Sequence, residues 1–222
     1  YSEASCDGDI PSPIYELNKF LQDSTKLPPY RDVPGLKAKL RPYQKQGVRW
    51  LTFLRDQSLG ALLADDMGLG KTLQSICILH GKSLIVAPTS VLYNWEAEIK
   101  RFRSQLRVNI YHGPNRKLDI HADVIMTTYA VMRLDQEELA QQKWDVVILD
   151  EAQTIKNPDS KIAKAVYQIS SPFKLALTGT PIENRLDDLW SIFHFLNRGF
   201  MHQRKDFQRD YIKPISLGDK EV

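Results

Sequence analysis

A short glycine-containing stretch has the residue types and spacing to bind phosphate. It runs from Asp65 to Thr72, reads Asp-Asp-Met-Gly-Leu-Gly-Lys-Thr, and lies between an apolar run and an apolar stretch with helical spacing. A strand, a glycine loop and a helix in this order hold phosphates, because backbone N–H groups and the helix N-terminus point at the anion. Lys71 is placed to reach the outer phosphates and Thr72 to ligate Mg²⁺. A plain glycine-rich turn with a solvated lysine is the alternative.

A second motif supplies two adjacent carboxylates. The four apolar residues 146–149 lead directly into Asp150 and Glu151. Ligands of open α/β sheets bind beyond the carboxyl ends of the strands, so both side chains are predicted to lie at a ligand site. Asp150 is predicted to hold Mg²⁺, and Glu151 to orient or deprotonate the water that attacks a γ-phosphate. An acidic strand end without a ligand is the alternative, and the presence of the phosphate loop upstream argues against it.

A third apolar run, residues 175–177, leads into Thr178, Gly179 and Thr180. Taken alone, these residues indicate only a strand that leaves the sheet through a turn. After the other two motifs, their hydroxyls are predicted to sense the γ-phosphate. The three motifs together predict one nucleotide site, built from separate strands at a single edge of a sheet.

The elements that must position these motifs are short apolar runs alternating with helical patterns. The expected strands are residues 59–64, 83–87, 108–111, 124–127, 146–149 and 174–178. The expected helices are one that starts at Pro42 and others near 71–80, 90–103, 129–141, 160–169 and 185–196. Apolar runs without alternation fit strands buried on both faces of a parallel sheet. The pattern predicts an α/β fold with a mostly parallel central sheet and helices on both faces.

Composition narrows the class of protein. The chain has 222 residues, of which 42% are hydrophobic, and its net charge is +3. No apolar run approaches the ~20 residues of a membrane span, and the first residues lack the pattern of a secretory signal. Cys6 and Cys77 are far apart and suggest neither a disulfide nor zinc, and a reducing interior is expected. Cys77 falls in an apolar helical pattern and is expected in the core.

Basic residues gather in local clusters. The clusters are Lys37, Lys39, Arg41, Lys45 and Arg49; then Lys100, Arg101, Arg103 and Arg107; then Arg116 and Lys117. A single cluster fits a solvated face, whereas several on a nucleotide-binding domain fit a polyanionic partner.

The sequence divides into three parts. Residues 1–35 form an N-terminal segment that contains several prolines, with one short amphipathic helix predicted near residues 14–21. Residues 36–198 carry the regular alternation and the three motifs. Residues 199–222 form a C-terminal extension, either a helix or a capping loop.

Four segments together resemble the Swi/Snf-type ATPases, helicase-like motors of superfamily two. The segments are residues 40–44 (Leu-Arg-Pro-Tyr-Gln), 64–72 (Ala-Asp-Asp-Met-Gly-Leu-Gly-Lys-Thr), 150–153 (Asp-Glu-Ala-Gln) and 177–184 (Leu-Thr-Gly-Thr-Pro-Ile-Glu-Asn). The resemblance covers residues 36–215 and implies a RecA-like P-loop lobe with ATP and Mg²⁺ as cofactors. It also implies double-stranded DNA, a second RecA-like lobe of the same protein and a DNA-bound protein target as partners.

The resemblance implies roles for further residues. Gln44 would recognise adenine with Arg41 beside it, although Arg41-Pro42-Tyr43 is also an ordinary helix start with proline in the first turn. The nucleotide would contact Asp66, Met67, Gly68, Leu69, Gly70, Lys71 and Thr72. The resemblance places DNA contacts at Pro88, Thr89, Ser90, Thr127, Thr128 and Tyr129, and coupling of the ATP site to the motor at Gln153, Thr178, Gly179 and Thr180. Thr89 and Ser90 are equally ordinary helix caps, and Trp95 is expected in the core.

Two departures from the family pattern bear on function. Gln153 stands where many members have histidine, which alters the coupling without excluding it. Nothing after residue 184 resembles the second lobe, which supplies the arginine fingers in the family. The chain therefore resembles lobe one of a longer protein, expected to bind Mg²⁺–ATP weakly and hydrolyse it slowly when alone. Asp65, where the general phosphate-loop pattern has glycine, matches the acidic residue of this family.

The resemblance implies a DNA-dependent ATPase that translocates on double-stranded DNA to remodel or displace bound proteins. Two alternatives stay open: the motor lobe of a strand-separating helicase or restriction-enzyme translocase subunit, and a non-catalytic domain that uses its nucleotide pocket as a switch. Compact spacing between the motifs favours a prokaryotic source and a cytoplasmic, nucleoid location, with a nuclear one expected if the source is eukaryotic.

Overall fold

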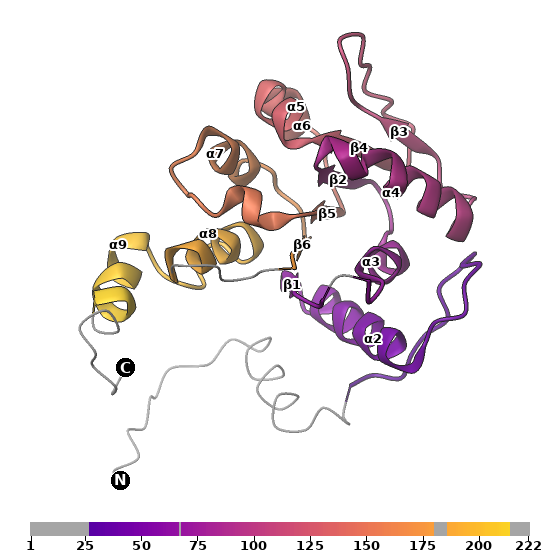
Figure 1. Cartoon of the computed structure of the whole chain (residues 1–222), viewed down its shortest axis with the longest axis horizontal. Coiled ribbons are helices and arrows are strands. Elements are labelled where there is room, and N and C mark those ends of the chain that lie inside the picture. Colours follow the sequence, from indigo (N-terminus) through magenta and orange to yellow (C-terminus); the bar gives the residue numbers. More distant parts are fainter. Residues whose placement is uncertain (1–26, 67, 180–185, 214–222) are drawn as a thin grey trace.

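A six-stranded sheet forms the centre of the fold in the computed structural model, which describes residues 27–66, 68–179 and 186–213. The strands are β1 (Ala61–Leu63), β2 (Ser83–Ala87), β3 (Val108–Ile110), β4 (Val124–Thr128), β5 (Val146–Leu149) and β6 (Phe173–Leu177). Their order across the sheet is β1-β6-β5-β2-β4-β3, and each neighbouring pair is parallel (Figure 1). The predicted α/β class is confirmed.

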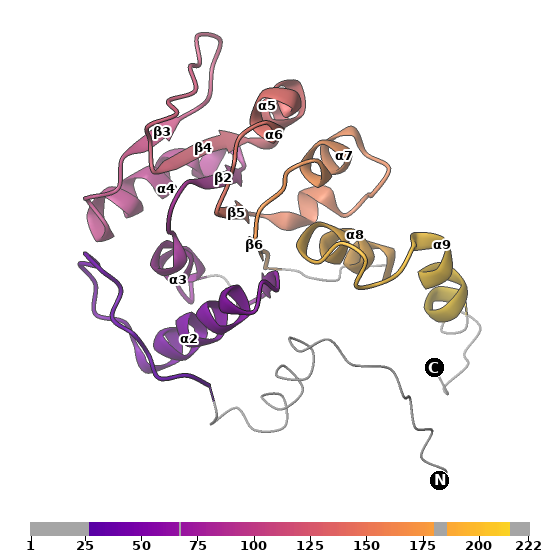
Figure 2. The same cartoon turned by 180° about the vertical axis from the view of Figure 1, so that it is seen from behind.

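Helices cover both faces of the sheet. One face carries α2 (Pro42–Asp56), α3 (Lys71–Ile78) and α4 (Thr89–Phe102). The other carries α5 (Tyr129–Leu134), α6 (Gln136–Ala140), α7 (Lys161–Tyr167) and α8 (Leu186–Leu196), and the two groups lie on opposite sides in both views (Figures 1 and 2). Along β2, Ile85 packs into the first layer and Leu84 into the second, and both are fully buried. Alternate residues of one strand thus feed two separate cores, which is why β2 contains no polar position that faces solvent.

Two expected elements differ in the structure. The helix expected over 129–141 is two helices, because α5 ends at Leu134 and Asp135 leaves helical geometry with φ −111° and ψ 30°. The Asp135 carboxylate accepts hydrogen bonds from Arg116 and from the Tyr111 hydroxyl at 2.8 Å, so tertiary contacts hold the break. The other difference is β3, which is only half-buried because it is an edge strand that pairs with β4 alone.

Two arginines of the basic clusters, Arg103 and Arg116, are engaged within the fold. Arg103 is only 8% exposed, and its Nη1 donates to the carbonyls of Ile76 and Leu79 at 3.1 and 2.6 Å. These carbonyls lie at the C-terminal end of α3 and at its C-cap, Leu79, where helical carbonyls lose their regular intrahelical donors. Arg116 forms a two-pronged pair with Asp135, as described above. Arg103 and Arg116 are therefore structural, and the predicted polyanion partner does not depend on them.

Replacing Arg103 with alanine should lower the free energy of unfolding by about 3 kcal/mol, because two charge-assisted hydrogen bonds to buried carbonyls are lost. Equilibrium urea denaturation measures this. Lys100→Ala is the matched control on the same helix, since its exposed ion pair with Glu96 contributes less than ~0.5 kcal/mol. Equal effects of the two substitutions would contradict a structural role for Arg103.

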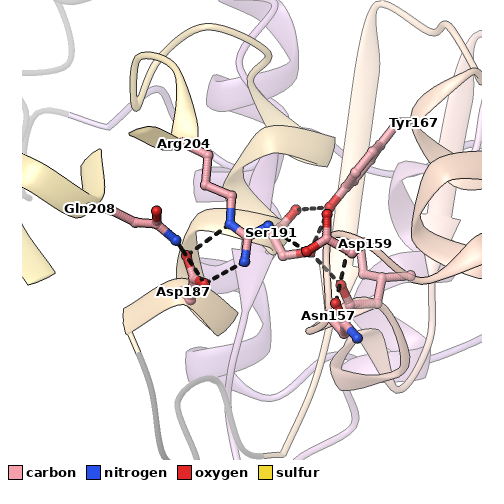
Figure 3. A network of polar contacts seen from close by, with 8 residues as sticks. Asn157, Asp159, Tyr167, Asp187, Ser191, Arg204 and Gln208 are labelled. Carbon is pink, nitrogen blue, oxygen red and sulfur yellow. Dashed lines mark hydrogen bonds and ion pairs between the residues drawn. The ribbon is translucent and has the colours of Figure 1, made fainter. Parts of the chain in front are cut away.

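The C-terminal extension is helical where the structure describes it. α9 (Arg204–Phe207) and the following π-helical turn η3 (Gln208–Ile212) lie beside α8. Arg204 donates to Asp187 on α8 at 2.7 Å and to Asp159 at 2.6 Å, and Gln208 also reaches Asp187 (Figure 3). The extension is thus fastened to the lobe by ion pairs at its start.

Three smaller expectations can be placed. Cys77 is 6% exposed, and burial raises the pKa of its thiol to about 12, so its place in the core is confirmed. The amphipathic helix expected near residues 14–21 and Cys6 lie outside the described residues. No helix in the described part of the chain is long and apolar enough to cross a membrane.

Candidate active site

The three sequence motifs meet at one edge of the sheet. They follow β1, β6 and β5, which are neighbours in the strand order, so their carboxyl ends lie side by side. A cavity of about 770 Å³ opens there. Its lining from the three motifs is Gly68, Gly70, Lys71, Thr72, Asp150, Glu151, Gln153 and Gly179. Residues far apart in sequence therefore form one site, as their position after buried strands predicts.

The phosphate loop is shaped by glycines with left-handed backbone angles. Gly68 has φ +85° and Gly70, the N-cap of α3, has φ +76°. The Lys71 ammonium donates to the backbone carbonyls of Asp65 and Asp66, the latter at 3.1 Å. Lys71 is thus held by the loop's own carbonyls in this conformation, and phosphate oxygens would replace them. Met67, also predicted to contact nucleotide, lies outside the described residues.

The Gln44 side chain contacts the phosphate loop at Leu69 and Gly70. It is 7% exposed, accepts from the Arg41 N–H at 3.0 Å through Oε1, and its Nε2 lies 3.5 Å from the carbonyl of Leu69. α2 begins at Pro42, so the segment is also the helix start that its sequence suggests. Arg41 and Gln44 lie outside the described lining of the cavity. Their predicted adenine contact requires Gln44 to exchange these bonds for the base.

Replacing Gly70 with alanine should weaken Mg²⁺–ATP binding about tenfold or more. A Cβ there would stand 2.5 Å from the Gln44 Nε2, and the left-handed backbone adds ~1–2 kcal/mol of strain. Titration calorimetry measures the affinity. Gly199→Ala is the matched control, because Gly199 has φ +91°, lies away from the cavity and has nothing within 4 Å of the new Cβ. Unchanged affinity in Gly70→Ala would show that the loop adapts to a side chain.

The acidic pair lies at the end of β5. The Asp150 carboxylate accepts from the Trp95 indole N–H at 2.7 Å and from the Glu151 backbone N–H at 3.0 Å. Burial raises the pKa of Asp150 above its ordinary value, and the bond from Trp95 opposes that rise. Glu151 has φ +51° and ψ 55°, a conformation that a side-chain-bearing residue adopts only under constraint. It is the N-cap of the short 3₁₀ helix η2 (Ala152–Ile155), whose Gln153 also lines the cavity.

A chain of hydrogen bonds holds the Glu151 carboxylate. Gln153 Nε2 donates to Glu151 Oε2 at 2.6 Å, and the Thr178 hydroxyl donates to Gln153 Oε1 at 2.8 Å. The third motif therefore contacts the second through Gln153, the residue that departs from the family pattern. Gly179 lines the cavity, and Thr180 lies outside the described residues.

The donor set of the cavity suits Mg²⁺. The Asp150 carboxylate and the Thr72 hydroxyl both line it and offer the hard oxygen ligands that Mg²⁺ prefers. Within the described ranges no three histidine, cysteine, aspartate or glutamate side chains form a metal cage. One carboxylate beside a phosphate loop is the usual protein share of a Mg²⁺–nucleotide site, because the phosphates supply other ligands.

The residues predicted to contact DNA lie directly after β2 and at the end of β4, and these two strands are paired neighbours. Thr89 and Ser90 are exposed in the first turn of α4, where no side chain caps the helix, so they are not the N-caps that the alternative expected; Pro88 holds that position. The side chains of residues 127–129, the other segment predicted to contact DNA, are turned inward. Thr127 is 0% exposed, Thr128 3% and Tyr129 5%. Those three side chains are engaged inside the fold, so in this conformation they do not present themselves to a ligand.

Sequence reasoning missed the contribution of α4 to the cavity. Val91, Asn94, Trp95 and Glu98 all line it. Their spacing of three and four residues places them on one face of the helix, which is the signal that could have identified them. Trp95 was expected in the core and is 2% exposed, but its N–H binds the carboxylate predicted to hold Mg²⁺.

Fold and site together define a P-loop nucleotide-binding lobe: a parallel sheet with a phosphate loop after one strand and an acidic pair after a near neighbour. The SNF2-related domain family matches residues 43–222, and the chain belongs to this family. It is an SNF2-family ATPase lobe, as the resemblance implied.

Individual relatives agree with the family. The chain is 43% identical, over 93% of its length, to YwqA of Bacillus subtilis, a protein named as a candidate ATP-dependent helicase/translocase. It is 40% identical, over 88% of its length, to the TATA-binding protein-associated factor MOT1 of Saccharomyces cerevisiae. The chain spans only 24% and 12% of these two proteins.

A solved structure matches the fold as well. The Sulfolobus solfataricus SWI2/SNF2 ATPase core in complex with double-stranded DNA superposes with a TM-score of 0.81 and 44% identity. The match covers 86% of this chain and 42% of that chain.

Proposed function

We propose that this chain is the nucleotide-binding lobe of an ATP-driven motor that moves along double-stranded DNA and displaces or remodels proteins bound to it. The observation that carries the proposal is a single cavity lined by Lys71, Asp150 and Glu151, at the sheet edge where α4 presents its exposed first turn. A relative of known structure was solved with duplex DNA, which supports the DNA partner. A relative named for its association with the TATA-binding protein fits a DNA-bound protein as target.

Each group in the cavity has a role in the proposed hydrolysis. Lys71 and the loop N–H groups bind phosphate oxygens. Thr72 and Asp150 would hold Mg²⁺, which would neutralise charge on the phosphates. Glu151 orients and deprotonates the attacking water, and its hydrogen bond from Gln153 fixes the carboxylate in place.

Duplex DNA would lie across the N-termini of α4 and α5. Exposed Thr89 and Ser90 can donate to phosphate oxygens, and the start of α4 adds the positive end of its dipole. Contacts of this kind position the backbone without reading sequence. Binding should therefore be independent of sequence and fall steeply with salt.

The test compares two assays on the full-length protein that contains this chain. We expect ATP-dependent displacement of a third strand from a triplex, without separation of the duplex strands. Lys71→Ala is the control and should abolish displacement, because the phosphates lose their cation. Strand separation would instead favour a helicase, and a protein that binds nucleotide but neither hydrolyses it nor displaces DNA would favour a switch domain.

A further inference from the structure

Asp150 is held by aromatic side chains from two different helices. The Trp95 indole N–H of α4 donates to the Asp150 carboxylate at 2.7 Å, and the Tyr129 hydroxyl of α5 donates to the Asp150 backbone carbonyl at 2.7 Å. Both aromatic residues are almost fully buried, with 2% and 5% of their surface exposed. The residue proposed to hold Mg²⁺ is thus bonded through its side chain to one helix and through its backbone to the next.

These two helices are the ones whose first turns lie at the proposed DNA face. α4 begins at Thr89, one residue past the N-cap that follows β2, and α5 begins at Tyr129 itself, directly after β4. β2 and β4 pair in register from Ser83 with Val124 to Ala87 with Thr128, so both helices start side by side at the same sheet edge. Trp95 lies six residues into α4, about 9 Å along its axis from Thr89.

The hydrogen bonds from Trp95 and Tyr129 prevent Asp150 from moving independently of α4 and α5. A hydrogen bond of 2.7 Å to a carboxylate is short and charge-assisted, and it is lost when the two atoms separate by roughly 0.8 Å. A helix packed into a dense core moves as a unit, so a shift of α4 at its first turn reaches Trp95. Among the described residues, the carboxylate accepts one further hydrogen bond, from the backbone N–H of Glu151, the other member of the acidic pair.

We propose that Trp95 and Tyr129 are positioning residues that link contact of α4 and α5 with duplex DNA to the placement of Asp150, and so couple DNA binding to Mg²⁺–nucleotide binding. This inference rests on the proposed function, because it requires DNA to lie on these helix N-termini. It gives Tyr129 a role other than direct contact with DNA, which its burial disfavours. Coupling between two ligands is reciprocal, so Mg²⁺–nucleotide must tighten or loosen DNA binding by the same factor as DNA changes nucleotide binding.

Reciprocity supplies a test that does not depend on turnover. The dissociation constant of a labelled DNA duplex is measured by fluorescence anisotropy with the full-length protein, in the absence of nucleotide and with Mg²⁺ and a non-hydrolysable ATP analogue. In the unaltered protein the two constants should differ at least about fivefold. Trp95→Phe keeps an aromatic ring and removes the N–H, and Tyr129→Phe removes only the hydroxyl. Each should bring the ratio to within about twofold of one while leaving the nucleotide-free constant unchanged.

Matched controls separate positioning from packing. Trp190→Phe removes a buried indole N–H for which the described structure shows no partner. Tyr167→Phe removes a partly buried hydroxyl that bonds to Ser191 away from the cavity (Figure 3). Both controls should keep the ratio of the unaltered protein. A second readout is the affinity of the protein–ADP complex for Mn²⁺ without DNA, measured by electron paramagnetic resonance. It should fall about tenfold in Trp95→Phe and stay unchanged in the two controls.

The outcomes distinguish the inference from the proposed function. Failure of the unaltered protein to bind duplex DNA would overturn both. Duplex binding that does not respond to nucleotide, or a ratio that persists in both Trp95→Phe and Tyr129→Phe, would overturn the inference alone. Because Tyr129→Phe deletes a single oxygen atom, it keeps the test decisive if Trp95→Phe does not fold.

Discussion

Replacing Glu151 with glutamine in the full-length protein should reduce ATP turnover by ~10²–10⁴ while nucleotide and DNA binding persist. Glu151 lines the cavity beside Asp150 and is the proposed base for the attacking water. Its carboxylate already accepts a hydrogen bond from Gln153 at 2.6 Å. Glutamine at position 151 can still accept that bond through its amide oxygen, so the substitution removes the ability to take a proton and changes little else. A coupled assay of phosphate release measures the rate.

Binding measurements make this result specific. The variant should bind Mg²⁺–ATP with an affinity within about threefold of the unaltered protein, because Lys71, Thr72 and Asp150 remain. Glu137→Gln is the matched control: it removes a carboxylate from the exposed face of α6 and should leave turnover unchanged. Turnover by Glu151→Gln within tenfold of the unaltered rate would remove Glu151 from the chemistry and favour the switch alternative.

The fold could be predicted where strands are buried on both faces of the sheet, because such strands require consecutive apolar residues. β2, β4 and β5 are buried at every position, and each contains an unbroken run of three or four apolar residues in the sequence. The break at Asp135 was not predictable, because nothing local interrupts the helical pattern there. It depends on Arg116 and Tyr111, which reach Asp135 from a preceding loop and strand end. The local sequence pattern therefore predicts that a helix or strand exists. Where it ends depends on tertiary contacts that the local sequence does not reveal.

The site shows the same division. That Lys71, Asp150 and Glu151 lie at one cavity was predictable, because phosphate and metal chemistry requires their types directly after strands, and parallel strands end at a common edge. The role of Trp95 was not found, because a tryptophan on an apolar helix face indicates core packing whether or not its N–H has a special partner. That partner, Asp150, is 55 positions away. Tyr129 was predicted to contact DNA, but its hydroxyl faces inward and donates to the backbone carbonyl of Asp150.

The 222-residue chain expressed alone should hydrolyse ATP roughly 10³–10⁵ times more slowly than the full-length protein in the presence of DNA. Lys71 is the one cation among the described residues that line the cavity. Phosphoryl transfer spreads negative charge over the transferred group, and an additional arginine placed in the transition state accounts for a factor of this size. The chain spans about a quarter or less of its curated relatives, so this arginine is expected outside it.

The comparison requires that any residual rate come from this site. Lys71→Ala in the isolated chain should remove the residual hydrolysis, whereas Lys100→Ala, at an exposed ion pair on the outer part of α4, should not. The isolated chain should still bind Mg²⁺–ATP measurably, because the phosphate loop, Thr72 and Asp150 are all present. Fast, DNA-stimulated turnover by the isolated chain would mean that these residues suffice for catalysis, and the need for a second lobe would then lie in movement along DNA alone.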